Sequence, residues 1–319
     1  MSTRTAVVTA ASGLNIRPNP STSEPAIGKL PLGTSVDIVE QRGGWYLIQS
    51  GALTGFAFGD FISFRDASPT VGFLCFDPHL CEAPMEPPPG ERIEATHANT
   101  PIRRSVAQAW NRYGGLLRPL SQRIAIPPAA AAAVLVVESG GHGFIDGRMV
   151  IRFENHVFHD RWGKSNPETF ARHFAFSPSK RWTGHTFRAD PQAPFESFHG
   201  KQAGEWRVFE FARGLNEAAA MRSISMGSPQ IMGFNHAAIG YDSVQEMFDR
   251  FQAEDRFQIL GMFDFIKGAG STSSMIQSLQ RGHFDQFASR YNGPGQASVY
   301  GSRIREHFEA LRAMDPTLG

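Results

Sequence analysis

The chain has 319 residues, of which 41% are hydrophobic and 19% are charged, a composition typical of a soluble globular protein with room for two domains. Its formal net charge of +1 provides no basic field that would attract nucleic acid or an anionic membrane surface. The longest apolar run, Ala129 to Val137, is much shorter than the roughly 20 residues of a membrane helix, and the first residues lack the apolar core of a signal peptide, so we expect synthesis in the cytoplasm without one.

Residues 1–64 contain short segments typical of β-strands. "TAVVTA", "SVDIVEQ" and "WYLIQS" are rich in β-branched and aromatic residues and are separated by clusters of Gly, Pro, Asn and Ser, which predicts a small all-β barrel. The motifs "LNIRPNP" and "GFAFGDFIS", with glycines at the turns between them, resemble a bacterial SH3-like (SH3b) domain. This resemblance implies a module that binds cell-wall peptide or glycan, in which case the aromatic residues either contact the ligand or fill the barrel. They are Trp45, Tyr46, Phe56 and Phe58.

Residues 65–100 are rich in proline and in acidic and polar residues, as in "EAPMEPPPGERIEATHANTP". That composition favours an extended spacer between two domains. The segment also holds both cysteines of the chain, Cys75 and Cys81, in "CFDPHLC". Their spacing fits either a small disulfide loop or two reduced thiols, and His79 between them lacks the second ligand pair of a zinc finger.

From Pro101 onward the pattern becomes helical. "PIRRSVAQAWNRYGG" carries apolar residues at three- and four-residue steps and ends at a glycine pair, and "GLLRPLSQRIAI" predicts a second helix. A third, central helix starts near Pro127 and Pro128, carries Glu138 in its last turn and ends at Gly140 and Gly141. An acid at the end of a buried helix is either paired with an arginine or kept protonated as a general acid, and these residues alone leave both interpretations open.

Two later motifs favour the second interpretation. "SMGSPQIMGFN" (225–235) combines glycines and small residues with amides, and "RYNGPG" (290–295) follows a helical segment. In the order Glu-Ser-Gly-Gly, Gly-x-x-Gln-Ile and Tyr-Asn-Gly, these motifs resemble the lysozyme-like superfamily of goose-type lysozymes and lytic transglycosylases. Together with "WNRYGGLL" and "IRFENHVFH", they resemble more narrowly the N-acetylmuramidase domain of phage endolysins, over about residues 98–311.

The two resemblances imply an α+β multidomain protein. Its parts are an SH3-like wall-binding barrel (1–64), a Pro-rich linker (65–100) and a mostly α lysozyme-like N-acetylmuramidase domain with a small β-hairpin (101–319). The family's catalytic acid falls on Glu138, and its glycan groove falls on Ser225, Gln230, Tyr291 and Asn292. Relatives carry an aromatic residue where this chain has Met226, so we do not expect Met226 to stack on a sugar.

A hydrolase that activates water uses a second carboxylate. In "GFIDGRMVIRFENHVFHDRWG", Asp146 and Gly147 predict a hairpin turn and "RMVIRF" a strand, which puts Glu154 at the strand's end. Glu154 is therefore the second catalytic candidate, ahead of Asp146 and Asp160. An ion pair between Glu154 and Arg152 explains the same residue equally well.

The histidines nearby predict no metal site. His142, His156 and His159 cluster in the sequence, but the His-Glu-x-x-His motif is missing, so we interpret them as polar residues around a groove and expect no metal and no cofactor. The long segment 172–206 has little regular pattern and is expected to wall the groove. Its Trp182 and Trp206 either stack on sugars or pack in the core.

The sequence thus predicts a peptidoglycan hydrolase that cleaves the β-1,4 bond between N-acetylmuramic acid and N-acetylglucosamine. Water completes the reaction, steered by a second acid or by Gln230. Two alternatives stay open: a lytic transglycosylase that forms 1,6-anhydro products, and an inactive wall-binding protein. The expected partner is peptidoglycan, reached in the periplasm or cell wall after holin-type release or injection. If the chain is a toxin, an immunity protein or secretion machinery is a further possible partner. We expect neither nucleic acid nor a membrane as a partner.

Overall fold

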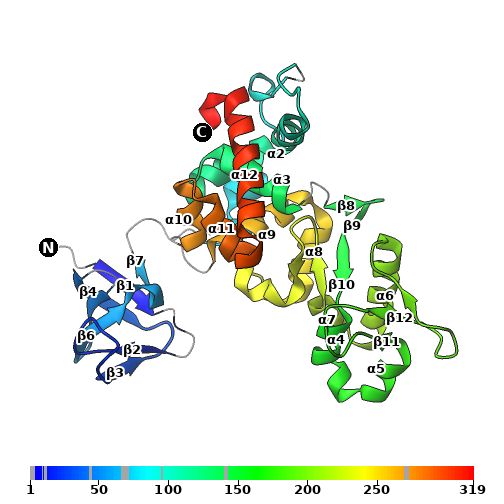
Figure 1. Cartoon of the computed structure of the whole chain (residues 1–319), viewed down its shortest axis with the longest axis horizontal. Helices are drawn as coiled ribbons and strands as arrows, with labels where there is room; N and C mark the ends of the chain where they lie inside the picture. The colour runs from blue at the N-terminus through cyan, green and yellow to red at the C-terminus, as the bar shows by residue number, and fades with distance from the viewer. Residues whose placement is uncertain are drawn as a thin grey trace. The chain divides into compact units, whose positions relative to one another are not determined.

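The computed structural model divides the chain into two compact units, Met1–Val71 and Gly72–Gly319 (Figure 1). The first is built of strands and the second is mostly helical with small β elements, so the predicted fold class is confirmed. The structure describes residues 4–8, 10, 13–42, 45–65, 72–94, 96–139, 143–268 and 273–319.

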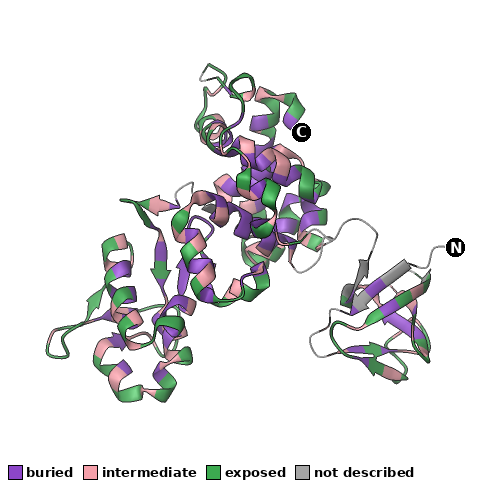
Figure 2. Ribbon diagram, turned by 180° about the vertical axis from the view of Figure 1, so that it is seen from behind, coloured by how far each residue is buried: buried purple, intermediate pink, exposed green. Residues whose placement is uncertain are grey.

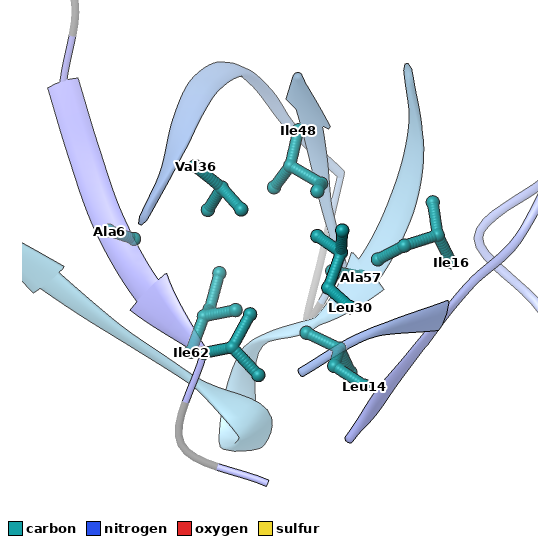
Figure 3. Packing of buried hydrophobic residues seen from close by; sticks show 9 residues of the cluster. Ala6, Leu14, Ile16, Leu30, Val36, Ile48, Ala57 and Ile62 are labelled. Atoms are coloured by element: carbon teal, nitrogen blue, oxygen red, sulfur yellow. The ribbon is translucent and has the colours of Figure 1, made fainter. Parts of the chain in front are cut away.

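The first unit is an antiparallel sheet in the order β6-β5-β4-β1-β7, next to the β2-β3 hairpin. Reciprocal hydrogen bonds between the Arg17 and Phe56 backbones join the hairpin to β6. Alternate strand residues point inward and form one apolar cluster (Figure 3), in which Ile16 and Ile48 are fully buried. The strands are β1 (Arg4–Val8), β2 (Leu14–Ile16), β3 (Gly28–Leu30), β4 (Ser35–Arg42), β5 (Trp45–Ser50), β6 (Leu53–Phe58) and β7 (Ile62–Arg65).

Residues 72–94, which the sequence analysis places in a spacer, pack on the helices of the second unit. The backbone N–H groups of Leu74 and Cys75 donate to the two carboxylate oxygens of Asp264 at 2.8 and 3.0 Å. Leu74 and Cys75 are fully buried, so the apolar residues between the prolines determine the packing of this segment. Both Cys75 and Cys81 are free thiols. The short elements here are η2 (Leu74–Phe76), α1 (Pro78–Glu82) and η3 (Pro89–Glu91).

Helix α2 (Pro101–Ile124) is continuous, so the prediction of two helices separated by a glycine pair was wrong. A Cβ on Gly115 would lie 2.4 Å from the Pro84 carbonyl oxygen and 2.3 Å from that of Glu86. The Gly115 N–H donates to the Met85 carbonyl at 3.0 Å. The glycines therefore allow segment 84–86 to approach the helix, and they do not end it.

Helix α3 (Pro128–Ser139) lies in the centre of the second unit, against α2 and α12 (Ala297–Met314). Residues Ala129–Val134 are fully buried, and the buried residues of this unit concentrate in the same helical centre (Figure 2). The remaining helices of this region are α8 (Val244–Ala253), α9 (Asp255–Lys267), α10 (Ser274–Gln280) and α11 (Phe284–Tyr291), with η6 (Pro294–Gln296) and η7 (Pro316–Leu318).

Within the described ranges, no single helix has the length and apolar composition needed to cross a membrane. Only α2 and residues Pro128–Glu138 of α3, taken together as a pair bent by 115°, meet those two criteria.

The β elements of the second unit lie beside its helical centre (Figure 1). The turn between β8 and β9 is formed by Asp146 and Gly147, both at positive φ (+50° and +74°), as predicted for a tight hairpin. The elements are β8 (Phe144–Ile145), β9 (Arg148–Met149), β10 (Ile151–Phe153), β14 (Ile224–Met226) and β15 (Ile231–Met232), with a small sheet of β11 (Phe174–Ala175), β12 (Thr186–Phe187) and β13 (Glu196–Ser197). Around them lie α4 (Asn155–Arg161), η4 (Gly163–Ser165), α5 (Pro167–His173), α6 (Gln202–Leu215), α7 (Glu217–Arg222) and η5 (Gly233–Ile239).

Candidate active site

Glu138 lies in the last turn of α3, directly after the buried part of the helix. Residues 129–135 are at most 2% exposed, whereas Val136, Val137 and Glu138 are half-buried. The small alanine side chains let α2 and α12 approach α3 closely, which fixes the direction of its end. Gly140, Gly141 and His142, which the sequence places in the following turn, lie outside the described residues.

The Tyr-Asn-Gly motif meets Glu138 at the end of α11. Asn292 caps this helix, since its backbone N–H donates to the Ala288 carbonyl at 2.8 Å. Its side-chain Nδ2 donates to Glu138 Oε2 at 2.8 Å. Gly293 follows at φ +91°, a conformation that favours glycine, and turns the chain toward α12. Two motifs 154 residues apart therefore share one hydrogen bond.

Burial raises the pKa of Glu138, and the hydrogen bond from Asn292 opposes this rise. No ion pair involves Glu138 in the described part of the chain. Its second oxygen, Oε1, is buried and has no hydrogen-bond partner among the described residues. The carboxyl thus has the environment of a group that stays protonated above its ordinary range and keeps one oxygen free.

Tyr291 lies close enough to Glu138 to respond to its charge. Burial and the Glu138 carboxylate both raise the pKa of the Tyr291 hydroxyl, so it is protonated at neutral pH. The ring stacks on Phe287, with centroids 5.5 Å apart, and meets the Phe265 ring edge-on at 6.0 Å. The structure therefore brings Glu138, Tyr291 and Asn292 together.

Gln258 connects the chain after Glu138 to the Gly-x-x-Gln-Ile turn. This side chain on α9 is fully buried; its Oε1 accepts the Ser228 N–H at 2.8 Å and its Nε2 donates to the Phe251 carbonyl at 2.9 Å. A Cβ on Gly143 would lie 2.3 Å from Gln258 Oε1, and one on Gly227 would lie 2.5 Å from the same atom. A larger residue at either position would displace the Gln258 amide, and Gly227 also has a φ of +68°, which favours glycine.

The Gly-x-x-Gln-Ile motif forms the turn between β14 and β15. Ser225 Oγ donates to Gln230 Oε1 and Gln230 Nε2 donates to the Gly227 carbonyl, both at 2.7 Å. Ser225 is buried, whereas Gln230 is exposed at φ +51°. These two groove candidates therefore support each other, and Gln230 is the one that faces solvent. Met226 is fully buried, in agreement with the expectation that it does not stack on a sugar.

Glu154 lies in a separate polar cluster, at the end of β10. Its Oε1 accepts a hydrogen bond from Arg152 Nε at 2.8 Å, and its Oε2 lies 3.4 Å from Nδ1 of both His156 and His185. No described side chain hydrogen-bonds to both Glu154 and Glu138, and Glu154 is not among the groups that shift the Glu138 pKa. The ion pair with Arg152, the alternative considered from the sequence, is present.

The remaining acid candidates, Asp146 and Asp160, differ in exposure and in their partners. Asp146 is exposed in the hairpin turn. Asp160 accepts from Arg181 at 2.7 Å and pairs with Lys164 at 2.9 Å, and the hydrogen bond from Arg181 lowers its pKa to about 2. It is therefore ionised at any working pH.

The two tryptophans of the long segment have different environments. Trp206 is 5% exposed, donates its indole N–H to the Met149 carbonyl at 3.0 Å and lies under the Arg148 guanidinium, which makes it a core residue. Trp182 is 65% exposed and is the one available for sugar contacts.

Sequence reasoning missed Gln258 and His185. A polar residue within the apolar run "FQILGMF" signals a buried side chain with hydrogen-bond partners, and that signal could have identified Gln258. His185 carries no comparable signal, because its nearest partner in the cluster, His156, is 29 residues away in an irregular segment.

The first unit contains a cavity of about 320 Å³ beside its sheet. Trp45 and Phe58 form one wall, with ring centroids 5.1 Å apart at 63°. Phe61 is 47% exposed, and Arg17 also lines the cavity. Of the aromatic residues considered from the sequence, Phe56 is buried in the barrel, whereas Trp45 and Phe58 line the cavity.

Comparisons with known proteins agree with this architecture. A bacterial SH3 domain family matches residues 12–63, and a family described as Muramidase, N-acetylmuramidase, matches residues 127–312. Among solved structures, the chain is similar to the crystal structure of Burkholderia AP3 phage endolysin, with 25% sequence identity, a TM-score of 0.50 and coverage of 67% of this chain and 81% of that chain. No curated protein matches the chain by sequence. The N-acetylmuramidase match spans more than half of the chain, so the protein belongs to this family: it is a peptidoglycan-cleaving glycoside hydrolase whose catalytic domain follows a bacterial SH3 domain.

Proposed function

We propose that the second unit hydrolyses the β-1,4 bond between N-acetylmuramic acid and N-acetylglucosamine, with Glu138 as the general acid. The observation that carries this proposal is the state of Glu138: a half-buried carboxyl with no ion pair among the described residues, a raised pKa and one buried oxygen without a partner. The protonated carboxyl donates its proton to the glycosidic oxygen as the bond to the muramic acid carbon breaks.

Asn292 has two roles in this scheme. Its hydrogen bond to Oε2 fixes the rotamer of Glu138, so that Oε1 is directed to the leaving oxygen. After proton transfer the same N–H stabilises the carboxylate, because a hydrogen bond to an ionised acceptor is stronger than one to a neutral acceptor. Tyr291 and the exposed Gln230 supply further polar groups for the glycan and for the water that completes hydrolysis.

A second candidate is the lytic transglycosylase reaction. In it the same carboxylate returns as a base and the muramic acid's own hydroxyl attacks, which requires no second carboxylate. Glu154 already accepts a hydrogen bond from Arg152 at 2.8 Å, which favours a reaction that needs no second carboxylate.

The test is digestion of purified sacculi by the full chain and by Glu138→Gln, with mass spectrometry of the released products. Hydrolysis gives reducing muramic acid ends, whereas the transglycosylase gives 1,6-anhydro ends. The matched control is Glu306→Gln, the same substitution at an exposed position of α12. If Glu138→Gln releases products as fast as Glu306→Gln, Glu138 is not the acid; if the unaltered chain binds sacculi and releases nothing, the protein is a wall-binding protein.

We also propose that the first unit binds the cell wall through the cavity lined by Trp45, Phe58, Phe61 and Arg17. Aromatic faces stack on sugar rings or cover peptide side chains, and a guanidinium binds a peptide carboxylate. Cosedimentation of Glu138→Gln with intact sacculi tests this, since that variant leaves the wall uncut. Adding Trp45→Ala should release most of the bound protein, whereas adding Val39→Ala, at an exposed apolar residue outside the cavity, should not.

A further inference from the structure

Glu154, His156 and His185 form a compact cluster of metal-ligating atoms in the second unit. Glu154 precedes α4, His156 lies in the first turn of that helix, and His185 directly precedes β12. Each residue has a ligand atom within 4.8 Å of those of the other two, and Glu154 Oε2 lies 3.4 Å from Nδ1 of both histidines. The side chain of His185 is fully buried, and those of Glu154 and His156 are 13% and 22% exposed.

We propose that these three residues bind a divalent transition metal ion of the zinc type. Two imidazole nitrogens and one carboxylate oxygen form a donor set that suits Zn²⁺ and leaves a fourth position for a further ligand. This site is independent of the Glu138 site and of the sugar chemistry proposed for it.

The distances fit a single ion. Zinc binds histidine nitrogen and carboxylate oxygen at about 2.0–2.2 Å, so two ligand atoms of a tetrahedral site lie roughly 3.3 Å apart. Glu154 Oε2 lies 3.4 Å from Nδ1 of His156 and 3.4 Å from Nδ1 of His185. Hydrogen bonds do not account for all of these contacts. Glu154 Oε2 and His156 Nδ1 are both buried and have no hydrogen-bond partner among the described residues.

The surrounding groups orient the ligands as second-sphere partners do in metal sites. His185 Nε2 donates to the Arg181 carbonyl at 2.9 Å, which fixes the ring and leaves Nδ1 as the nitrogen that faces both Glu154 Oε2, at 3.4 Å, and His199 Nε2, at 2.9 Å. Arg152 holds the other oxygen of Glu154 at 2.8 Å, so Oε2 is the one free to bind. Burial lowers the pKa of both His156 and His185, which favours the neutral ring that binds metals.

A proton is the rival occupant. His199 Nε2 lies 2.9 Å from His185 Nδ1, and His199 Nδ1 lies 2.8 Å from Glu205 Oε1. The Arg181 carbonyl and the Glu205 carboxylate are acceptors, so each takes a proton from one of the two rings. The hydrogen bond between the rings needs a third proton. Three protons on two rings make one of them an imidazolium. A metal ion at His185 Nδ1 replaces the shared proton, and His199 then keeps only its bond to Glu205.

The ion would add a link between two parts of the chain that Asn155 already joins, since its Nδ2 donates to the Ala175 and Thr186 carbonyls at 2.7 and 2.8 Å. Glu154 and His156 belong to the β10–α4 junction, whereas His185 belongs to the segment of β11, β12 and β13. Metal binding should therefore stabilise this segment and slow its hydrogen exchange, with little change at α3 and α11.

The first experiment measures metal content and spectrum on the full chain. The protein is purified in zinc-containing buffer, and gel filtration removes unbound zinc. Inductively coupled plasma mass spectrometry should then find one equivalent of zinc per chain. Replacement with Co²⁺ should give the visible absorption bands of a four- or five-coordinate ion with nitrogen ligands. A protein that retains no zinc, shows no such bands and has the same melting temperature with and without added Zn²⁺ would overturn the proposal and leave the shared proton as the occupant.

The second experiment assigns the ligands. His156→Gln and Glu154→Gln should each lower the affinity for Zn²⁺ at least tenfold. His159→Gln is the matched control, since His159 lies one turn further along α4, close in sequence to His156 but outside the cluster. Equal loss in all three variants, or in none, would refute this ligand set. His185→Gln is confirmatory only if circular dichroism shows that it folds, and Glu138→Gln should retain zinc whether or not Glu138 is the catalytic acid.

Discussion

The role assigned to Gln258 can be tested by Gln258→Met, which keeps the length of the side chain and removes its polar atoms. The substitution leaves the Ser228 N–H and the Phe251 carbonyl without the partners they have at 2.8 and 2.9 Å. Both hydrogen bonds are buried, and Gln258 itself is fully buried. An unsatisfied buried donor or acceptor costs about 1–3 kcal/mol, so the two together should lower the free energy of unfolding by about 2–6 kcal/mol.

The assay is urea unfolding followed by helical circular dichroism, a signal that the second unit provides. The control is Gln245→Met on α8, an exposed residue whose amide donates to Asp249 Oδ1 at 2.9 Å; we expect a change within about 0.5 kcal/mol. At a temperature where both variants are folded, Gln258→Met should also release peptidoglycan products about tenfold to a hundredfold more slowly, because the Ser228 N–H, in the turn that carries Gln230, loses the Gln258 oxygen that accepts its hydrogen bond.

Two results would refute this reasoning. If Gln258→Met unfolds at the same urea concentration as Gln245→Met, the two hydrogen bonds do not hold the region together. If it is destabilised as expected but the folded fraction keeps full activity, Gln258 stabilises the unit without positioning the chain that follows Glu138.

Three further predictions follow from contacts described above. Gly115→Ala should lower the free energy of unfolding by about 1–3 kcal/mol because its Cβ meets backbone oxygens, whereas Gly214→Ala, on an open helix face, should be neutral or raise it by up to about 1 kcal/mol; equal effects would contradict the packing of segment 84–86 on α2. Burial raises the pKa of Asp264 to about 6 from 3.8, so the folded state binds more protons than the unfolded state between about pH 4 and 6 and stability falls as pH rises through that window. Across this window the free energy of unfolding of the unaltered protein should therefore fall by at most about 3 kcal/mol more than that of Asp264→Asn. Parallel curves of unfolding free energy against pH for the two proteins would contradict this. Asn292→Ala removes the interaction that lowers the pKa of Glu138, so the loss of activity on the alkaline side should move to higher pH; an unchanged profile would mean that another group titrates there.

The periodic parts of the fold could be predicted from the sequence. The β-branched segments became strands of the first unit, and a helix runs from Pro128 to Ser139, starting at the prolines that indicate its first turn. The glycine pair in α2 misled the prediction because glycine serves both to end a helix and to admit a close neighbour, and only the position of Pro84 and Glu86 decides between them. The same limit applies to residue 185, whose role depends on contacts over long sequence separation.

The site divides in a similar way. Glu138 and Asn292 lie in motifs far apart in the sequence, and the structure joins them by a hydrogen bond, while the pKa of Tyr291 responds to the Glu138 charge. Glu154 was selected as a carboxylate at a strand end, but strand position carries no information about which other side chains reach that end. Arg152, two residues earlier in the chain, donates a hydrogen bond to it at 2.8 Å, and a catalytic role for Glu154 stays a prediction.

The packing of residues 72–94 also determines where the enzyme can be cut or joined to another targeting module. A fragment that starts at residue 127, where the family match begins, loses α2 and uncovers the alanine face of α3. A fragment that starts at residue 101 keeps α2 but loses the Glu91 carbonyl, which accepts the Trp110 indole N–H at 2.9 Å. It also loses Ile93, whose backbone N–H donates to the Asn111 side chain and whose carbonyl accepts from it. Chimeric enzymes that exchange the SH3 domain should therefore be joined before Gly72, since the residues beyond it are part of the catalytic body and do not serve as an interchangeable tether.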